Sequence, residues 1–259
     1  MTHEDSYGMI EPSTGLGTQP LAAHVVSVLS RRQAVNPAGA RILILDYLVR
    51  ATLSPNLFDP AQVLHELRGH RLTIDTIIDL YVPQAAIELG QMWQSSDIDF
   101  ADVTIGALRL QALLSEATAE MPYLPSAGIA DVLSALMIVP EGEQHFLGAN
   151  VAAAQLRRLG CDAAVSFCET PKQVMARIIG DQPDMVLISC ARAYPLDAIS
   201  MTVQKIRSHA NPVPVIALGG AITGDVDGIK ELTGVDLVTH LPKDVVGFCT
   251  KRRKAIGRG

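Results

Sequence analysis

The sequence predicts an α + α/β protein, in which an N-terminal helical bundle precedes a flavodoxin-like, doubly wound domain with a five-stranded parallel sheet. Up to about residue 118, apolar residues recur at helical spacing and strand-like runs are almost absent. After residue 131, short apolar runs alternate with helical segments of roughly 10–14 residues, a pattern typical of a parallel sheet covered on both faces. The five strand-like runs are residues 132–139, 162–167, 184–189, 214–220 and 235–240.

The chain divides into five predicted regions. They are a disordered tail (1–19), a helical cap bundle (20–120), a linker (121–131), the α/β domain (132–250) and a basic tail (251–259). The linker is assigned to MPYLPSAGIAD because its two prolines and its glycine interrupt both the helical and the strand patterns.

Local signals mark where helices begin or break. Asp59 and Pro60 fit the N-cap and the first position of the helix that follows them. Thr170, with Gln173 three residues later, predicts a capping box before another helix. Pro83 stands inside a long helical stretch, and we expect a kink or a break there because proline donates no backbone hydrogen bond.

Composition indicates a globular chain of 259 residues, 48% of them hydrophobic and 19% charged. No stretch offers the roughly 18 unbroken apolar residues that a membrane helix needs. The N-terminus lacks the basic start and apolar stretch of a signal peptide. The four cysteines show no C-x-x-C pair and no metal-type spacing, which fits a reducing cytoplasm, and we expect Cys161 and Cys190 to be small core residues.

The charge distribution is uneven. A formal net charge of −6 argues against bulk electrostatic binding to DNA or RNA. The last nine residues, KRRKAIGRG, nevertheless hold five basic and no acidic side chains. We expect this run to be a solvated end, and a weak contact with DNA or with an acidic partner is the alternative.

Candidate ligand-binding residues gather after three of the predicted strands. In open parallel sheets, ligands bind at the carboxyl ends of the strands, near the point where the strand order reverses. In flavodoxin-like order, the first, third and fourth strands are neighbours. The loops after these three strands carry Glu143, His145 and Gly148, then Ser189, then Gly219 and Gly220.

Each of these features has a simpler explanation when taken alone. A single histidine in a turn is more often a surface residue, a Gly-Gly pair suits a tight turn, and a serine at a strand end commonly caps the next helix. The first loop, EGEQHFLG, also lacks the G-x-G-x-x-G fingerprint of dinucleotide-binding proteins. The occurrence of all three features in the expected loops is what favours an elongated ligand slot.

The second half of the chain resembles the cobalamin-binding domain, whose pattern is Asp-x-His-x-x-Gly, then Ser-x-Leu or Ser-x-Thr, then Gly-Gly. The first half carries a second resemblance, because GQMWQSSDIDFADVTIGALRLQALL looks like the helical cap that precedes such domains in methionine synthase and cobalamin photoreceptors. Within it, FADVTIGALRLQ looks most like the AerR/PpaA group. Members of that group are cobalamin-binding antirepressors of photosynthesis genes in purple bacteria.

The resemblance implies roles for the matching residues. Cobalamin would bind with its dimethylbenzimidazole tail detached from cobalt, and His145 would be the lower axial ligand of the metal. Glu143, where the family has Asp, would accept a hydrogen bond from the second ring nitrogen. Ser189 would hydrogen-bond the tail base, while Gly219 and Gly220 would let the tail pass close to the backbone. We therefore expect a His145→Ala variant to lose base-off binding, and a Gly220→Val variant to block the tail with its fold largely intact.

The resemblance says less about the upper face of the cofactor. Trp93 fits the tryptophan that shields the upper axial group in related photoreceptors, and ordinary core packing is the alternative. Ten positions on, where those proteins have Glu-His, stand Val103 and Thr104, so an upper histidine ligand is not expected there. Ala191 departs from the Leu or Thr of the family pattern.

Together these features predict a cytoplasmic, light-responsive transcription regulator that is not an enzyme and acts by protein contact. By resemblance, its partner is a CrtJ/PpsR-type repressor of photosynthesis genes. Two alternatives remain open: a corrinoid shuttle protein of a methyltransferase system, and a heme-binding redox sensor in which His145 ligates iron.

Overall fold

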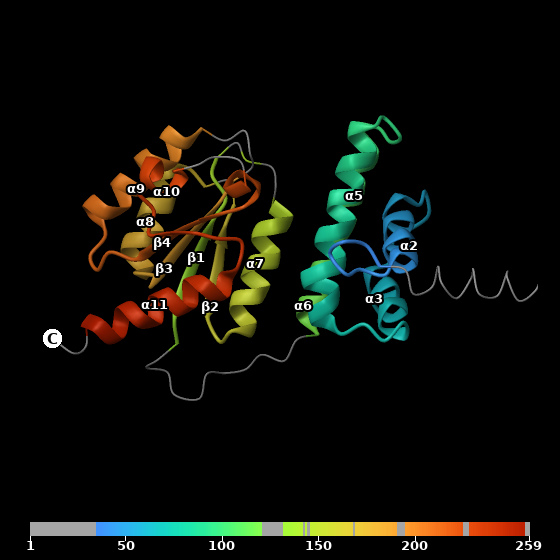
Figure 1. Ribbon diagram of the computed structural model, residues 1–259, viewed down its shortest axis with the longest axis horizontal. Helices are drawn as coiled ribbons and strands as arrows, with labels where there is room; N and C mark the ends of the chain where they lie inside the picture. Colours follow the sequence, from blue (N-terminus) through green and yellow to red (C-terminus); the bar gives the residue numbers. More distant parts are fainter. Residues whose placement is uncertain are drawn as a thin grey trace, which may run out of the picture.

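The structure, a computed structural model, describes residues 35–120, 132–141, 143, 146–167, 169–190, 195–224 and 228–256. A helical bundle and an α/β domain lie side by side (Figure 1). The predicted N-terminal tail, the first 15 residues of the predicted cap and the predicted linker lie outside the described residues. No helix in the described part of the chain is long and apolar enough to span a membrane.

The cap is built from amphipathic helices around one apolar core. They are α2 (Ile42–Leu53), α3 (Pro60–Gly69), α4 (Ile74–Thr76), the π-helix η1 (Ile77–Tyr81), α5 (Val82–Gln94) and α6 (Phe100–Ala119). The predicted start of α3 is confirmed, because the Asp59 side chain accepts hydrogen bonds from the backbone N–H groups of Ala61 and Gln62. The core residues include Leu48, Leu64 and Leu113, each almost fully buried.

The interruption predicted at Pro83 takes the form of a π-helix. The chain stays helical from Ile74 to Gln94, but residues 77–81 adopt wider π turns directly before the proline. Proline offers no N–H to the carbonyl one turn earlier, and a local π segment is one way in which helices absorb such a defect.

A capping box fixes the start of helix α6, and a glycine lets the helix pack closely on α5. Asp99 and Asp102 form a reciprocal capping box at its start. A side-chain carbon at Gly106 would lie 2.8 Å from Leu89 Cδ1, so any larger residue here would make the end of the Leu89 side chain shift. The result is a tight α5–α6 pair.

The α/β domain has the predicted flavodoxin-like topology. Its strands are β1 (Ser134–Ile138), β2 (Asp162–Ser166), β3 (Met185–Ser189), β4 (Val215–Gly219) and β5 (Leu237–Val238). All are parallel and lie in the order β2-β1-β3-β4-β5. Since the chain leaves β1 toward β2 on one side and later returns to β3 on the other, the strand order reverses between β1 and β3.

Helices cover both faces of this sheet. They are α7 (Phe146–Arg158), α8 (Pro171–Asp181), α9 (Leu196–His209), α10 (Ile229–Thr233) and α11 (Pro242–Ile256), with a short 3-10 helix η2 (Ala221–Gly224). One apolar cluster joins α7 and α11 to the sheet, and a second joins α8, α9 and α10. The Thr170–Gln173 capping box of α8 is present as predicted, and Cys161 and Cys190 are buried as expected.

The predicted basic tail from residue 251 needs correction. Helix α11 continues to Ile256, so most of this segment belongs to the domain. The Arg252 guanidinium donates to the carbonyls of Pro214 and Val213, and Arg253 forms an ion pair with Asp184 at 3.0 Å. These basic side chains hold α11 against the sheet, which is why the run KRRK does not behave as a solvated end.

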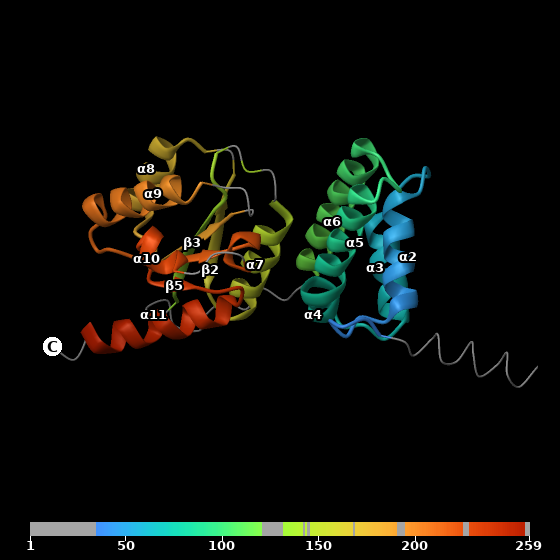
Figure 2. The same ribbon diagram turned by 45° about the horizontal axis from the view of Figure 1, so that its top comes forward.

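Helix α7 belongs to both parts of the molecule. Figure 2 shows it lying between the sheet and the cap helices α5 and α6. Val151 and Ala154 of α7 lie in the same apolar cluster as the cap core, while Ala149 and Leu156 pack in the cluster beneath the sheet. The cap therefore rests on the helix that follows the first candidate loop.

Candidate functional site

The loops after β1, β3 and β4 meet at one edge of the sheet. The Cys190 backbone N–H donates to the Gly219 carbonyl at 3.2 Å, and the Ile222 N–H donates to the Cys190 carbonyl at 3.3 Å. These bonds extend the β3–β4 pairing past the ends of the strands. The edge lies at the carboxyl ends of the strands, where parallel sheets bind ligands.

Glu143 joins this edge from the loop after β1. Its side chain is buried, with 7% of the residue exposed. Burial, and to a lesser extent the nearby Glu143 carboxylate, raise the pKa of the Cys190 thiol to about 12. Because β1 and β3 pair side by side up to Ile138 and Ile188, the loops that follow them begin next to each other, as the topology predicts.

Gly220 closes the edge against Cys190. Its φ of +93° lies in the left-handed region, and a side-chain carbon there would overlap the Cys190 carbonyl oxygen and lie 2.9 Å from its nitrogen. A side-chain carbon at Gly219 would lie 3.0 Å from the Thr239 carbonyl oxygen. The expectation that a Gly220→Val variant would keep its fold is therefore wrong, because the fold itself requires this glycine.

Ser189 presents a hydroxyl at the same edge. It is the last residue of β3, is half-buried and pairs in register with Gly219. Its side chain makes no hydrogen bond to another described residue. The hydroxyl can therefore bond a ligand that enters beside the glycines.

Other predicted site residues lie around the start of α7. His145, the predicted metal ligand, and Ala191 lie outside the described residues. Gly148 is exposed in the first turn of α7, with nothing within 4 Å of the position where a side-chain carbon would sit. Phe146, which begins α7, packs edge-on against Phe167 at 5.3 Å.

The residues predicted for the upper face lie on the cap. Trp93 is 48% exposed near the end of α5 and contacts the Phe100 ring edge-on at 6.3 Å, so it is not an ordinary core residue. Val103 packs, partly buried, on the cap core, and the exposed Thr104 donates to the Phe100 carbonyl at 2.7 Å. In both ribbon views the end of α5 lies at the same end of the molecule as the start of α7 (Figures 1 and 2).

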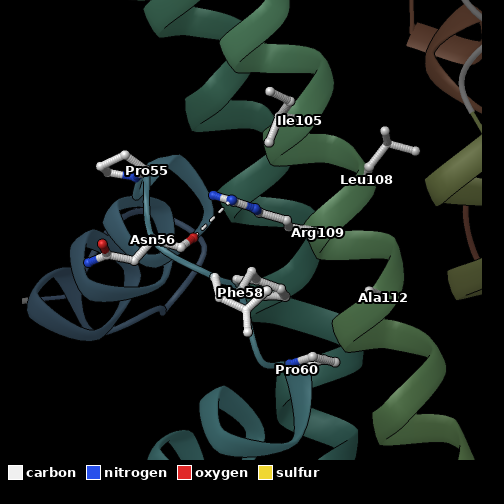
Figure 3. Close-up of a pocket in the computed structure, with 9 residues that line it drawn as sticks. Pro55, Asn56, Phe58, Pro60, Ile105, Leu108, Arg109 and Ala112 are labelled. Carbon is white, nitrogen blue, oxygen red and sulfur yellow. Dashed lines mark hydrogen bonds between the residues drawn. The ribbon is translucent and has the colours of Figure 1, made fainter.

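A separate groove of about 620 Å³ lies on the cap between the α2–α3 loop and α6 (Figure 3). The Arg109 guanidinium holds its wall by donating to the carbonyls of Thr52, Ser54 and Asn56. The groove is lined by cap residues alone and includes no strand end, so its chemistry is not that of the predicted slot.

Comparisons with known proteins identify the domain. Residues 133–242 match the family described as B12 binding domain. A Rhodobacter capsulatus protein, described as an uncharacterized 20.5 kDa protein in the bchF-crtJ intergenic region, is 33% identical over 175 residues, which are 68% of this chain and 91% of that protein. The chain belongs to this family of B12-binding-domain proteins.

Among solved structures, the Methanosarcina barkeri monomethylamine corrinoid protein has the same fold. It aligns with a TM-score of 0.64 and 13% identity, over 81% of this chain and 96% of that chain. At this identity the likeness concerns the fold alone, and it extends over the cap as well as the α/β domain.

Cobalamin is the cofactor of this domain, and the described residues fit it. A hydroxyl without a described protein partner stands beside two glycines at the strand ends, where the family pattern has Ser and Gly-Gly. A buried carboxylate follows β1, where the pattern has Asp two residues before the histidine. The roles of the individual residues stay predictions.

Two features of the site escaped the sequence reasoning. The contact of Glu143 with Cys190 could not be found because nothing in the spacing pairs them, although both follow adjacent predicted strands. The need for glycine at position 220 comes from backbone approach across the β3 and β4 ends. Its signal in the sequence is the Gly-Gly pair, which suits both a tight turn and the close passage of a ligand tail.

Proposed function

We propose that the protein is a light-responsive, cobalamin-binding regulator, and not a catalyst, which acts by protein contact as an antirepressor of photosynthesis genes. The observation that carries this proposal is the relative that is 33% identical over 68% of this chain. That relative is described as a protein of the bchF-crtJ intergenic region. The gene name crtJ is that of the repressor type which the AerR/PpaA resemblance gives as partner. A cytoplasmic location is part of the proposal.

The chain's own residues would hold the cofactor from three loops. His145 would supply the lower axial nitrogen to cobalt, and Glu143 would fix the imidazole by accepting its other N–H. Ser189 would hydrogen-bond the detached tail base. Beside it, Gly219 and Gly220 have no side chains and would let the tail lie close to the backbone. When bound, cobalamin supplies a cobalt–carbon bond that visible light breaks.

The cap would pass this change on. Trp93 is exposed on the cap at the end that the candidate loops share, so it can contact an upper axial group. The cap also rests on α7, which begins directly after the predicted ligand loop. A change in the upper group would therefore shift the equilibrium between cap positions and so alter the surface that a partner meets.

Binding to the repressor tests this function. Purified chain loaded with adenosylcobalamin is mixed with a tagged CrtJ/PpsR-type repressor in the dark and after illumination, and the captured fraction is measured. We expect capture to differ at least about fivefold between the two conditions, which corresponds to roughly 1 kcal/mol of coupling. A His145→Ala variant is the control and should lose the difference. No association in either condition would exclude the regulatory function.

The corrinoid shuttle is the second candidate, because this chain shares its fold with a monomethylamine corrinoid protein. It predicts methyl transfer from a simple methyl donor when a companion methyltransferase is added, which the regulator does not. A heme-binding redox sensor is the third. The B12-binding family match favours cobalamin over heme, and a Soret band after incubation with heme, lost in His145→Ala, would support heme.

A weak DNA contact through the C-terminal basic residues stays a prediction. Arg252 and Arg253 are engaged with the domain, which leaves Lys251 and Lys254 exposed on the described part of α11. Two lysines neutralise few phosphates, so any binding should be weak and should disappear at moderate salt. Gel-shift titration at low and physiological salt measures this.

A further inference from the structure

Helix α7 connects the candidate site to the cap along its whole length. It begins at Phe146, directly after the predicted ligand loop, and ends at Arg158. Val151 and Ala154 lie in the cap core, so the helix and the cap share buried apolar surface. Any force that acts at the start of α7 can reach the cap through this helix.

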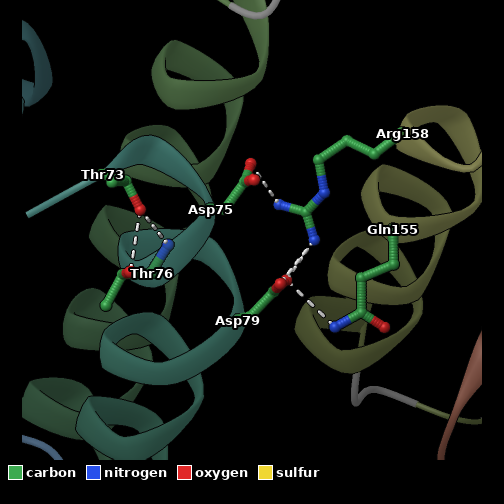
Figure 4. Close-up of polar contacts among 6 residues, drawn as sticks. All are labelled: Thr73, Asp75, Thr76, Asp79, Gln155 and Arg158. Carbon is green, nitrogen blue, oxygen red and sulfur yellow. Dashed lines mark hydrogen bonds and ion pairs between the residues drawn. The ribbon is translucent and has the colours of Figure 1, made fainter.

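The strongest polar contacts between α7 and the cap lie at the end of α7 that is far from the site. The Arg158 guanidinium pairs with Asp75 at 3.0 Å and with both carboxylate oxygens of Asp79 at 2.5 and 2.6 Å (Figure 4). The Gln155 amide donates to the same Asp79 at 3.0 Å. We call these four residues the clasp. The Arg158 side chain is 17% exposed, while the Asp75 and Asp79 side chains are 66% and 39% exposed, so solvent screens these charge-assisted bonds on the carboxylate side and less on the guanidinium side.

Polar contacts become fewer toward the site. The Asn150 side chain, one turn into α7, donates to Gln111 of α6 at 3.1 Å. Between Asn150 and the start of α7 at Phe146, the described residues form no hydrogen bond or ion pair with the cap. The described interface therefore has its ion pairs at one end of α7, a side-chain hydrogen bond one turn from the other end, and apolar contacts between them.

On the cap side, the clasp engages an irregular stretch of helix. Asp79 lies in the π-helix η1, and Pro83 follows it by four residues and so offers no N–H to its carbonyl. Thr73 caps the preceding turn by accepting from the Thr76 N–H. A capped turn that leads into a π segment presents both carboxylates to α7, at a place where the helix has lost regular hydrogen bonds.

At the other end of the cap, large apolar side chains are uncovered. Trp93 is 48% exposed, and its ring partner Phe100, the first residue of α6, is 65% exposed. We propose that Arg158 is a positioning residue: the clasp fixes the cap at its far end, the Trp93 end pivots toward and away from the site, and the clasp thereby sets how closely Trp93 approaches bound cobalamin. This inference goes beyond the proposed regulation, since it requires only that cobalamin binds.

Tryptophan fluorescence reports this distance directly, because Trp93 is the only tryptophan in the chain. Bound hydroxocobalamin absorbs in the tryptophan emission range and quenches Trp93 according to their separation. In the Arg158→Met variant, which keeps the aliphatic part of the side chain, we expect the quenching at saturation to fall about twofold or more. Without cofactor, amide hydrogen exchange in residues 77–81 should accelerate about tenfold, because local opening no longer breaks the clasp.

The matched control is Arg177→Met. Arg177 pairs with Glu169 at 2.9 Å, is 30% exposed and lies wholly within the α/β domain, so its removal should leave both readouts at wild-type values. A charge swap provides rescue: Arg158→Asp alone should behave as Arg158→Met does, and adding Asp79→Arg should recover most of the quenching. If Arg158→Met fails to fold by circular dichroism, the milder Asp79→Asn takes its place with the same expectations.

The outcomes separate cleanly. Full quenching with wild-type exchange in Arg158→Met would overturn the inference, as would equal losses in Arg177→Met or no recovery in the charge swap. The repressor takes no part in these measurements. A failure of the proposed regulation would therefore leave the clasp standing, and a failure of the clasp would leave the regulation open.

Discussion

At Gly220 the backbone takes a left-handed conformation and lies against the Cys190 peptide, so two independent constraints exclude a side chain. Valine adds steric overlap to an unfavourable φ, and we expect Gly220→Val to lower the free energy of unfolding by more than about 3 kcal/mol. Thermal denaturation without cofactor measures this loss. The control is Gly148→Ala, since Gly148 lies in a helix with open space around it and alanine should stabilise by about 0.5–1 kcal/mol. Equal stability of both variants would contradict the account.

Ser189 should matter to the cofactor and hardly at all to the fold. Its hydroxyl has no described protein partner at the end of β3, so Ser189→Ala leaves no described group unpaired. Loss of one hydrogen bond to the cofactor should weaken cobalamin binding about fivefold to tenfold, or roughly 1 kcal/mol. Equilibrium dialysis gives the affinity, and denaturation should show an unchanged stability. Unchanged affinity would show that the hydroxyl does not face the tail base.

Within the cap, Tyr47 and Glu66 give the fold a defined acid dependence. Hydrogen bonds from Tyr47 and Gln62 lower the pKa of Glu66 below its ordinary value of 4.5. A carboxyl group with a lowered folded pKa contributes stability that is present above pH 4.5 and is lost as the pH falls through its folded pKa. The Tyr47→Phe variant should therefore lose part of its stability at pH 7 and little at pH 2.5. Urea denaturation at the two pH values tests this, and equal losses at both would contradict it.

At the scale of elements, helix α11 contributes to the stability of the α/β domain. Arg252 and Arg253 bind carbonyls and Asp184 at the amino ends of the strands. A chain that ends at residue 250 should therefore be less stable by about 1–3 kcal/mol, because Asp184 loses its ion pair and the Pro214 and Val213 carbonyls lose donors. Denaturation of the shortened chain measures this, and replacement of both exposed lysines, Lys251 and Lys254, by glutamine is the control. If the shortened chain kept its full stability, the interpretation of these residues as a solvated tail would be supported instead.

Some elements follow from sequence by local chemistry alone. Asp59 with Pro60 and Thr170 with Gln173 fix helix starts, because a capping side chain needs only neighbouring backbone N–H groups. The continuous apolar runs likewise predicted the parallel sheet, and the flavodoxin-like class that they indicate supplied its strand order. What spacing could not show is long-range packing: the π segment before Pro83, the basic residues of α11 on distant carbonyls, and the sharing of α7 between two cores.

At the scale of the whole molecule, the cap, α7 and the strand ends form one connected path. The loops after β1, β3 and β4 converge where the family pattern places cobalamin, and the helix that leaves the first loop carries the cap. The end of α5, which carries Trp93, lies at the same end of the molecule as the start of α7 (Figures 1 and 2). In the proposed function, this arrangement would let a local change at the cofactor alter the position of the cap.

The central claim is that a histidine of this chain replaces the cofactor's own base beneath cobalt. Electron paramagnetic resonance of cob(II)alamin bound to uniformly ¹⁵N-labelled protein tests it most directly, because the axial nitrogen splits the cobalt signal according to its nuclear spin. The account predicts doublet splitting from a ¹⁵N ligand, which disappears in His145→Ala. Triplet splitting from ¹⁴N, unchanged by protein labelling, would show that the dimethylbenzimidazole tail remains on cobalt and would contradict the account.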